Sequence, residues 1–169
     1  MSKPNLEKTL ILFKPDTLQR GLVGEVLTRF ERVGLRIVAT KMLAPDRDHY
    51  SKHYEEIGQL KTRAGDTIFN ITLDMMNTGP VIAMVFEGVE AVALVRKMVG
   101  GTEPKSAAPG TIRGDYSHMS YGYADGEKKG IPNLIHASGD PKEAEKEISH
   151  WFSAPEMYDY EVLHEKFTR

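Results

Sequence analysis

The chain has 169 residues, 40 % of them hydrophobic and 27 % charged, which predicts a single globular domain over residues 1–169. Its 22 basic and 24 acidic side chains leave a net charge of −2, so no overall positive field attracts nucleic acid or an anionic membrane. The absence of cysteine excludes thiolate chemistry, and no apolar run is long enough for a signal peptide or a membrane span, so we expect a soluble, cytoplasmic protein.

The first half of the chain alternates between the periodicities of strands and helices. In order, it predicts a strand over Thr9–Phe13, a turn at Lys14-Pro15-Asp16, a helix over Leu22–Val33, a strand over Leu35–Leu43, a helix from the cap Asp46 to Leu60, and a turn around Gly65-Asp66. Gly34 ends the first helix, as glycine commonly does.

The second half repeats this alternation around one long loop. It predicts a strand over Pro80–Glu87, a helix over Val89–Val99, a loop over about 101–132, a strand over Asn133–His136, and a helix that begins after Asp140 and ends near Phe152. Asp140 as the cap, Pro141 in the first turn and Glu143 at the third position are typical of a helix start. The tail from Ser153 has no strong pattern.

The order of these elements favours an α+β fold. If the helix from Asp46 to Leu60 is an insertion, the remainder is βαββαβ, the ferredoxin-like sandwich in which helices cover a four-stranded antiparallel sheet. A parallel doubly wound sheet is the alternative, and periodicity does not choose between the two.

The long loop and the strand after it hold the candidate chemistry. Loops of this length in compact domains are usually functional, and this one presents cations and hydroxyl groups beside glycines, as a phosphate site requires. These residues are Arg96, Thr102, Lys105, Thr111 and Arg113. His136, before the predicted helix N-terminus, is a candidate nucleophile that accepts a group and passes it on. The alternatives are solvated loop cations and a structural histidine.

The other histidines give weaker signals. His49 and His53 lie four residues apart on one predicted helix, as metal ligands can, but no third ligand is evident. We therefore interpret both as solvated helix residues.

Short motifs along nearly the whole chain together resemble the nucleoside diphosphate kinase family. They are Lys14-Pro15-Asp16, Arg20-Gly21-Leu22-Val23-Gly24-Glu25, Arg29-Phe30-Glu31, Gly79-Pro80-Val81, Arg96-Lys97-Met98, Pro109-Gly110-Thr111-Ile112-Arg113-Gly114-Asp115, Asn133-Leu134-Ile135-His136 and Glu145-Lys146-Glu147-Ile148-Ser149-His150-Trp151-Phe152. The resemblance implies a ferredoxin-like fold and ping-pong transfer of the γ-phosphate of a nucleoside triphosphate such as ATP to a nucleoside diphosphate, through a phosphohistidine.

The resemblance also implies roles for individual residues. His136 would carry the phosphate, with Ser138 and Glu147 orienting it and Tyr54 near the phosphates. The expected nucleotide ligands are Lys14, Arg96, Thr102, Arg113 and Asn133, and the base contact falls at Ile68, with Phe69 as the alternative. Mg²⁺ would be bound through the nucleotide phosphates rather than in a protein cage, and the subunits would form a homo-hexamer or homo-tetramer.

Two features depart from the family pattern. Gly139 stands where the family usually has an aspartate, and residues 117–129 lengthen the loop before Asn133. Two other classes remain as rivals: an RNA-binding module on the same fold, and a relative that binds nucleotides without turnover. The strands lack the aromatic pattern that the first requires, and the retained Lys14, Arg113 and His136 argue against the second.

Overall fold

The computed structural model describes residues 5–168, which form a four-stranded sheet in the order β2-β3-β1-β4. The strands are β1 (Leu6–Phe13), β2 (Arg36–Leu43), β3 (Val81–Val89) and β4 (Ile135–Ala137). Every neighbouring pair is antiparallel. The predicted ferredoxin-like α+β fold is therefore confirmed, and the parallel alternative is wrong.

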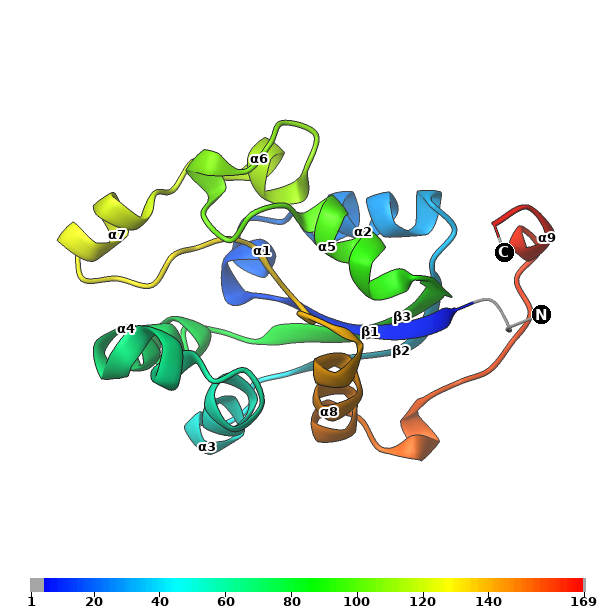
Figure 1. The fold of residues 1–169 in the computed structure, drawn as a ribbon, viewed down its shortest axis with the longest axis horizontal. Coiled ribbons are helices and arrows are strands. Elements are labelled where there is room, and N and C mark those ends of the chain that lie inside the picture. The colour runs from blue at the N-terminus through cyan, green and yellow to red at the C-terminus, as the bar shows by residue number, and fades with distance from the viewer. Residues whose placement is uncertain (1–4, 169) are drawn as a thin grey trace.

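Helices cover both faces of this sheet (Figure 1). One layer contains α2 (Val23–Arg32) and α5 (Ala91–Val99), and the other contains α3 (Arg47–Ser51), α4 (Leu60–Met76) and α8 (Pro141–Trp151). In β1, Leu10 and Leu12 pack into one layer, whereas Ile11 and Phe13 pack into the other. Burial on both faces explains why this strand is a continuous apolar run rather than an alternating one.

The N-terminal caps of two predicted helices are present. The Asp46 carboxylate accepts a hydrogen bond from the His49 amide, and Asp140 accepts from the amides of Lys142 and Glu143. The segment between β2 and β3 lies on the opposite face from α2 and α5, as expected for an insertion in βαββαβ.

Several local predictions are wrong because tertiary packing outweighs local signals. The turn at residues 14–16 leads directly into a short helix, α1 (Pro15–Gln19). Beyond α3 the chain continues as a π-helix, η1 (Lys52–Ile57), and the expected turn at Gly65-Asp66 is only a kink inside α4. Gly65 has φ +85°, which locally breaks the helical geometry, but the buried Phe69 and Leu73 hold the rest of α4 on the sheet.

The predicted loop over 101–132 contains three short helices. They are η2 (Pro104–Ser106), α6 (Ile112–Tyr116) and α7 (Tyr121–Gly126), and the last lies within the extra segment 117–129. The final strand begins at Ile135, two residues later than predicted, because Leu134 has φ +70° and cannot belong to a strand.

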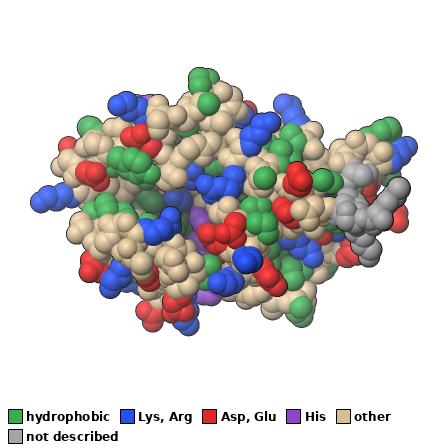
Figure 2. Space-filling model, in the orientation of Figure 1, with side chains coloured by type: hydrophobic (Ala, Val, Ile, Leu, Met, Phe, Trp, Pro, Cys, Tyr) green, Lys and Arg blue, Asp and Glu red, His purple; other side chains and the backbone are tan. Residues whose placement is uncertain are grey.

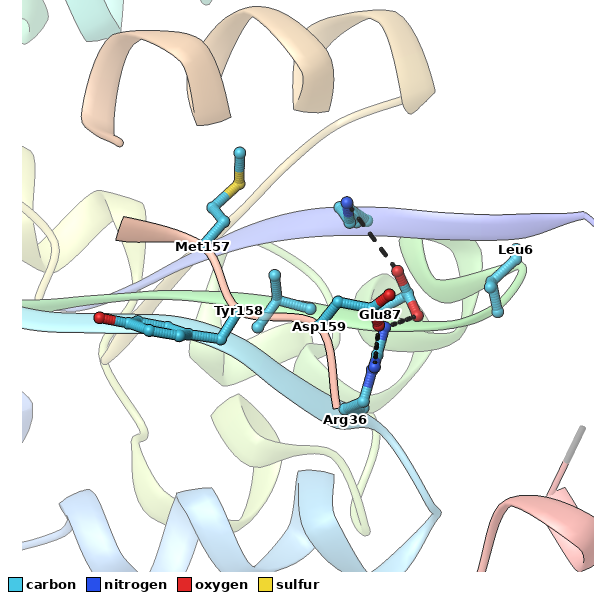
Figure 3. A pocket seen from close by; sticks show the side chains of 8 residues that line it. Leu6, Arg36, Glu87, Met157, Tyr158 and Asp159 are labelled. Carbon is cyan, nitrogen blue, oxygen red and sulfur yellow. Dashed lines mark hydrogen bonds and ion pairs between the residues drawn. The ribbon is translucent and has the colours of Figure 1, made fainter. Parts of the chain in front are cut away.

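The C-terminal tail contains η3 (Ala154–Glu156) and α9 (Glu165–Thr168) and lies along the outer edge of the sheet. The Tyr158 amide donates to the carbonyl of Val38 on β2, at 2.9 Å. Figure 3 shows the buried Arg36 between Glu87 and Asp159, at 2.6 Å from each carboxylate. These contacts attach the tail beside a cavity of about 420 Å³, at the end of β1 opposite the predicted site. No helix in residues 5–168 is long and apolar enough to cross a membrane.

Candidate active site

A cavity of about 550 Å³ brings together almost all of the predicted site residues. Its lining includes Lys14, Tyr54, Ile68, Arg96, Thr102, Arg113, Asn133, His136 and Glu147, whereas Ser138 is completely buried behind it. In Figure 2 the hollow on the left part of this face holds basic side chains and a histidine. Cations therefore surround a cavity whose floor carries the predicted nucleophile.

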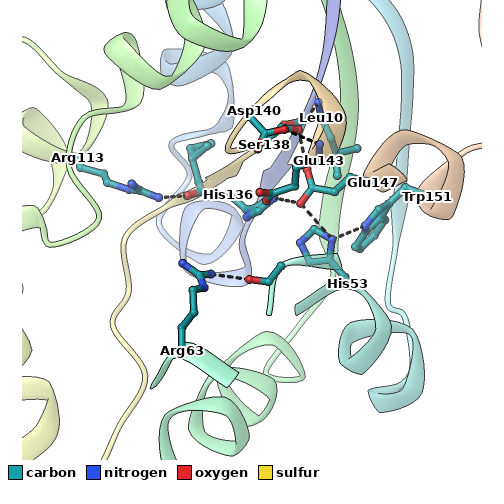
Figure 4. Close-up of polar contacts among 12 residues, drawn as sticks. Leu10, His53, Arg63, Arg113, His136, Ser138, Asp140, Glu143, Glu147 and Trp151 are labelled. Carbon is teal, nitrogen blue, oxygen red and sulfur yellow. Dashed lines mark hydrogen bonds and ion pairs between the residues drawn. The ribbon is translucent and has the colours of Figure 1, made fainter. Parts of the chain in front are cut away.

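His136 is held by a buried carboxylate from the neighbouring helix (Figure 4). β4 places it opposite Leu12 of β1, and its Nε2 lies 2.6 Å from Glu147 Oε1. The other carboxylate oxygen accepts from the Ser138 hydroxyl at 2.6 Å, and that hydroxyl accepts from the Leu10 amide at 3.1 Å. The imidazole is thus fixed through a chain of bonds that ends on the backbone of β1.

These hydrogen bonds assign the tautomer of His136. Because the Leu10 amide donates to Ser138, the serine proton points to Oε2 of Glu147, and an ionised Glu147 accepts a second hydrogen bond at Oε1. Nε2 of His136 therefore carries the proton, and the lone pair is on Nδ1, which no group in residues 5–168 occupies. Burial, and next the charge of Lys14, lower the pKa of His136 to about 3, so the ring is neutral near pH 7, as a nucleophilic imidazole must be.

His53 belongs to this network, so its interpretation as a solvated helix residue is wrong. It is buried, its Nδ1 accepts from the Trp151 indole at 3.1 Å, and the same atom lies 3.6 Å from Glu147 Oε1. His53, His136 and Glu147 could be taken for a metal cluster. The Trp151 proton points at the His53 nitrogen, however, so that nitrogen has no lone pair left for a metal, and the hydrogen bond to Glu147 comes from His136.

His49 is not solvated either. It is partly buried and its ring stacks on His150, with the ring centroids 4.0 Å apart. It lies outside the cavity lining, so the pair His49 and His53 does not form a site.

Lys14 and Arg113 are the buried cations of the cavity. Lys14 Nζ donates to Asn133 Oδ1 at 2.7 Å, and Arg113 donates to the carbonyls of Gly100, Asn133 and Ile135. Burial, and next the charge of Arg113, lower the pKa of Lys14 to about 8. The two side chains hold positive charge where water cannot screen it, which strengthens their attraction for phosphate.

A strained backbone residue fixes the position of Asn133. Leu134 has φ +70°, in the left-handed region, and three groups from the start of α1 hold it there. The Lys14 amide and the Thr17 hydroxyl donate to its carbonyl, and its own amide donates to the Asp16 carboxylate. The turn that the sequence predicted at residues 14–16 therefore also shapes the opposite wall of the site.

The remaining candidates of the long loop and of α5 divide into two groups. Arg96 and Thr102 line the cavity, whereas Lys105 does not. The Thr111 hydroxyl caps α6 by accepting from the Gly114 amide, so it serves the loop and not a ligand. Gly114 is required there because a Cβ atom would lie 2.1 Å from the Ala108 carbonyl oxygen.

The structure separates the two alternatives for the base contact. Ile68 lines the cavity and is 37 % exposed, whereas Phe69 is 8 % exposed and packs in the core. Ile68 is therefore the residue that a ligand in the cavity can reach.

Arg63 and Glu143 are among the lining residues that the sequence analysis missed. Arg63 lies on the part of α4 that was expected to lead into a turn. Glu143, on α8, occupies the space that the absent side chain of Gly139 leaves, since a Cβ at residue 139 would lie 2.6 Å from Glu143 Oε2. Glu143 thus brings a carboxylate to the turn where the family usually has aspartate.

A neutral imidazole held by a carboxylate, inside a cavity lined by cations, is suited to accept and release a phosphoryl group; with the ferredoxin-like sheet it defines a phosphotransferase. A family model described as nucleoside diphosphate kinase matches residues 7–157. The chain belongs to this family, and its activity is the transfer of phosphate from a nucleoside triphosphate to a nucleoside diphosphate.

Individual relatives agree with this assignment. The nucleoside diphosphate kinase of Borreliella burgdorferi is 44 % identical over 155 residues, which are 92 % of this chain and 92 % of the relative. That of Pyrococcus furiosus is 47 % identical, over 92 % of this chain and 88 % of its own. A solved structure described as a transition state mimic of the Borrelia burgdorferi enzyme with bound vanadate and ADP has a TM-score of 0.93 at 43 % identity and covers 97 % of both chains.

Proposed function

We propose that the single domain over residues 1–169 transfers phosphate through a phosphohistidine on Nδ1 of His136. The observation that carries this proposal is the hydrogen bond from Nε2 to Glu147, which leaves Nδ1 as the only ring nitrogen with a free lone pair. The surrounding Lys14, Arg96 and Arg113 supply the charge that phosphoryl oxygens require.

The transfer takes place in two matching steps. In the first, the Nδ1 lone pair attacks the γ-phosphorus, the bond to the β–γ bridging oxygen breaks, and the nucleoside diphosphate leaves with that electron pair. The positive charge that develops on the imidazole is balanced by Glu147. In the second, a terminal phosphate oxygen of the acceptor diphosphate attacks the same phosphorus, and the electron pair returns to Nδ1. Arg113 and Lys14 stabilise the oxygens in both steps.

Mg²⁺ fits this site as a partner of the nucleotide phosphates. The carboxylate of Glu147 is occupied by Ser138 and His136, so the described residues offer no cage of free carboxylates. Besides Glu147, the acidic side chains of the lining are Glu143 and Asp125, and either would accept hydrogen bonds from the waters of such an ion. The bound ion supplies neutralisation of phosphate charge.

Steady-state kinetics test the proposed relay. A covalent intermediate lets the first product leave before the acceptor binds, so double-reciprocal plots at several fixed donor concentrations are expected to be parallel. Lines that intersect to the left of the axis, with no exchange unless both nucleotides are present, would show direct transfer. The same assay distinguishes the enzyme from a silent relative, because the latter shows no turnover.

Glu147→Gln is expected to lower kcat/KM about 10- to 100-fold. The amide keeps the shape of the side chain but loses its charge and one acceptor, and a hydrogen bond to a charged group is worth about 1.5–3 kcal/mol. Rapid-quench measurement of phosphoenzyme formation checks this, with Glu145→Gln on the exposed side of the same helix as control. Equal rates for the two variants would contradict the role of Glu147.

The pH profile of kcat/KM is expected to fall above about pH 8. The pKa of Lys14 is about 8 in the free protein, so its charge is present below this pH and is lost above it. Loss of an essential cation lowers kcat/KM roughly tenfold per pH unit in that range. On the acid side, His136 stays neutral until the pH approaches 3, so its protonation does not lower kcat/KM near pH 6. A profile flat to pH 10 would exclude Lys14 as an essential cation.

Assembly and location are also proposals, which rest on the family resemblance. We propose a homo-hexamer or homo-tetramer in the cytoplasm, and light-scattering mass measures the assembly directly. An RNA-binding role is not favoured, because helices cover both faces of the sheet on which such modules bind RNA.

A further inference from the structure

Part of the cavity lining lies outside the set of phosphate-binding cations. One wall is α4, which presents Ile68 and Met75, and another is the loop after α6, which presents Tyr121 from the inserted segment and Ile131 just beyond it. These four residues offer mainly apolar surface, whereas the lining around His136 is cationic. A ligand whose phosphates lie at His136 therefore places its nucleoside between α4 and the insertion.

One face of α7 is turned to this space. Tyr121 and Asp125 lie one helical turn apart and both line the cavity. Tyr123, two residues further along than Tyr121, belongs to another face, does not line the cavity, and has the Lys129 ammonium 4.9 Å from its ring centroid. Tyr121 is 46 % exposed, so nearly half of its surface is open to a ligand.

Hydrogen bonds and packing hold α7 in this place. The Tyr121 amide donates to Glu103 Oε1 at 2.9 Å, and the Lys105 amide donates to the Met119 carbonyl at 3.0 Å. After α7, Gly130 lies so close to α4 that a Cβ atom would be 2.9 Å from Met75. The insertion is therefore a built wall of the cavity and not a free loop.

We propose that the ring of Tyr121 packs against the base of the bound nucleotide, opposite Ile68, and makes the inserted helix part of the nucleoside subsite. This inference rests on the proposed function, which places the phosphates at His136. Ile68 offers an aliphatic surface only, and Tyr121 supplies the aromatic face on which a base can stack. The competing contact is a hydrogen bond from the Tyr121 hydroxyl to a phosphate, since Tyr121 lies near enough to influence the pKa of Arg113.

Equilibrium binding of two probes to four proteins separates these contacts. ADP has a base and tripolyphosphate has none, and each is titrated by calorimetry against the wild-type chain, Tyr121→Ala, Tyr121→Phe and Tyr123→Ala. Tyr121→Ala is expected to weaken ADP binding at least about fivefold, as loss of a stacked base does, and to leave tripolyphosphate binding unchanged. Tyr121→Phe keeps the ring and is expected to bind ADP within twofold of wild type, as is Tyr123→Ala.

Three results would overturn the inference. The first is that Tyr121→Ala binds ADP as tightly as Tyr123→Ala does. The second is that Tyr121→Ala loses affinity for ADP and for tripolyphosphate equally, and the third is that Tyr121→Phe loses as much ADP affinity as Tyr121→Ala. The proposed function fails in a different way: the wild-type chain itself then forms no phosphoenzyme with ATP. A wild-type chain that is phosphorylated, beside unchanged binding in Tyr121→Ala, rejects only the role of Tyr121.

Discussion

Replacement of His136 by alanine is expected to remove the phosphoenzyme and to lower kcat/KM by at least about a thousandfold. The reason is that no second nucleophile in the cavity has a lone pair in the same place. His53 is the other lining histidine, and its Nδ1 accepts from the Trp151 indole. The measurements are labelling with γ-labelled ATP and the coupled turnover assay.

The control for this variant is His118→Ala, which changes an exposed histidine of the long loop that does not line the cavity. It is expected to keep the wild-type label and rate. An acid-labile label that persists at wild-type level in His136→Ala would show that another residue carries the phosphate.

Arg113→Ala is expected to lower kcat/KM by well over tenfold, because one charged contact to a transferring phosphate contributes at least about 2 kcal/mol. The structure adds a second effect. Arg113 also donates to the carbonyls of Gly100, Asn133 and Ile135, so its loss removes three hydrogen bonds within the fold and lowers Tm. Arg113→Lys is expected to restore only part of the activity, since an ammonium cannot replace the guanidinium fork.

Lys105→Ala is the matched control for the loss of a loop cation, because Lys105 lies in the same loop outside the cavity. The kinetics are measured well below the Tm of each variant, so that unfolding does not enter. If Arg113→Ala retains the kcat/KM of Lys105→Ala, the phosphates are bound elsewhere.

The sequence predicted the fold well wherever one residue type settles the local structure. Asp140 and Pro141 begin α8, and the apolar strand at Thr9–Phe13 lies in the centre of the sheet. The prediction of a turn around Gly65-Asp66 was wrong, because only the tertiary contacts of Phe69 and Leu73 keep α4 in place beyond Gly65. Periodicity carries no information on such long-range contacts.

In the site, too, motifs predicted some residues, whereas others depend on tertiary contacts that the sequence does not show. His136, Glu147 and Lys14 could be predicted from motifs, and the structure brings all three to one cavity. The part played by His53 could not, because its nearest site partners, Glu147 and Trp151, are about a hundred residues away in the chain. Only the packing of η1 against α8 reveals that this helix residue lies beside His136.

Glu143 occupies the space next to Gly139, where the sequence departs from the family pattern. From the sequence alone, Gly139 marks a missing carboxylate next to Ser138. In the structure the Glu143 side chain, one helical turn into α8, fills the space above Gly139. A side chain that reaches back over a turn cannot be recognised from its position in the sequence.

The nitrogen that carries the phosphate tests the central claim most directly. The chain labelled with ¹⁵N in its histidines is phosphorylated with ATP, freed of nucleotide and examined by ¹H–¹⁵N and ³¹P NMR at alkaline pH, where phosphohistidine is stable. Because Glu147 binds Nε2 of His136, the account predicts phosphorus coupled to Nδ1 of that residue and transfer of the group to added GDP. Phosphorus on Nε2, or on any other side chain, would contradict it.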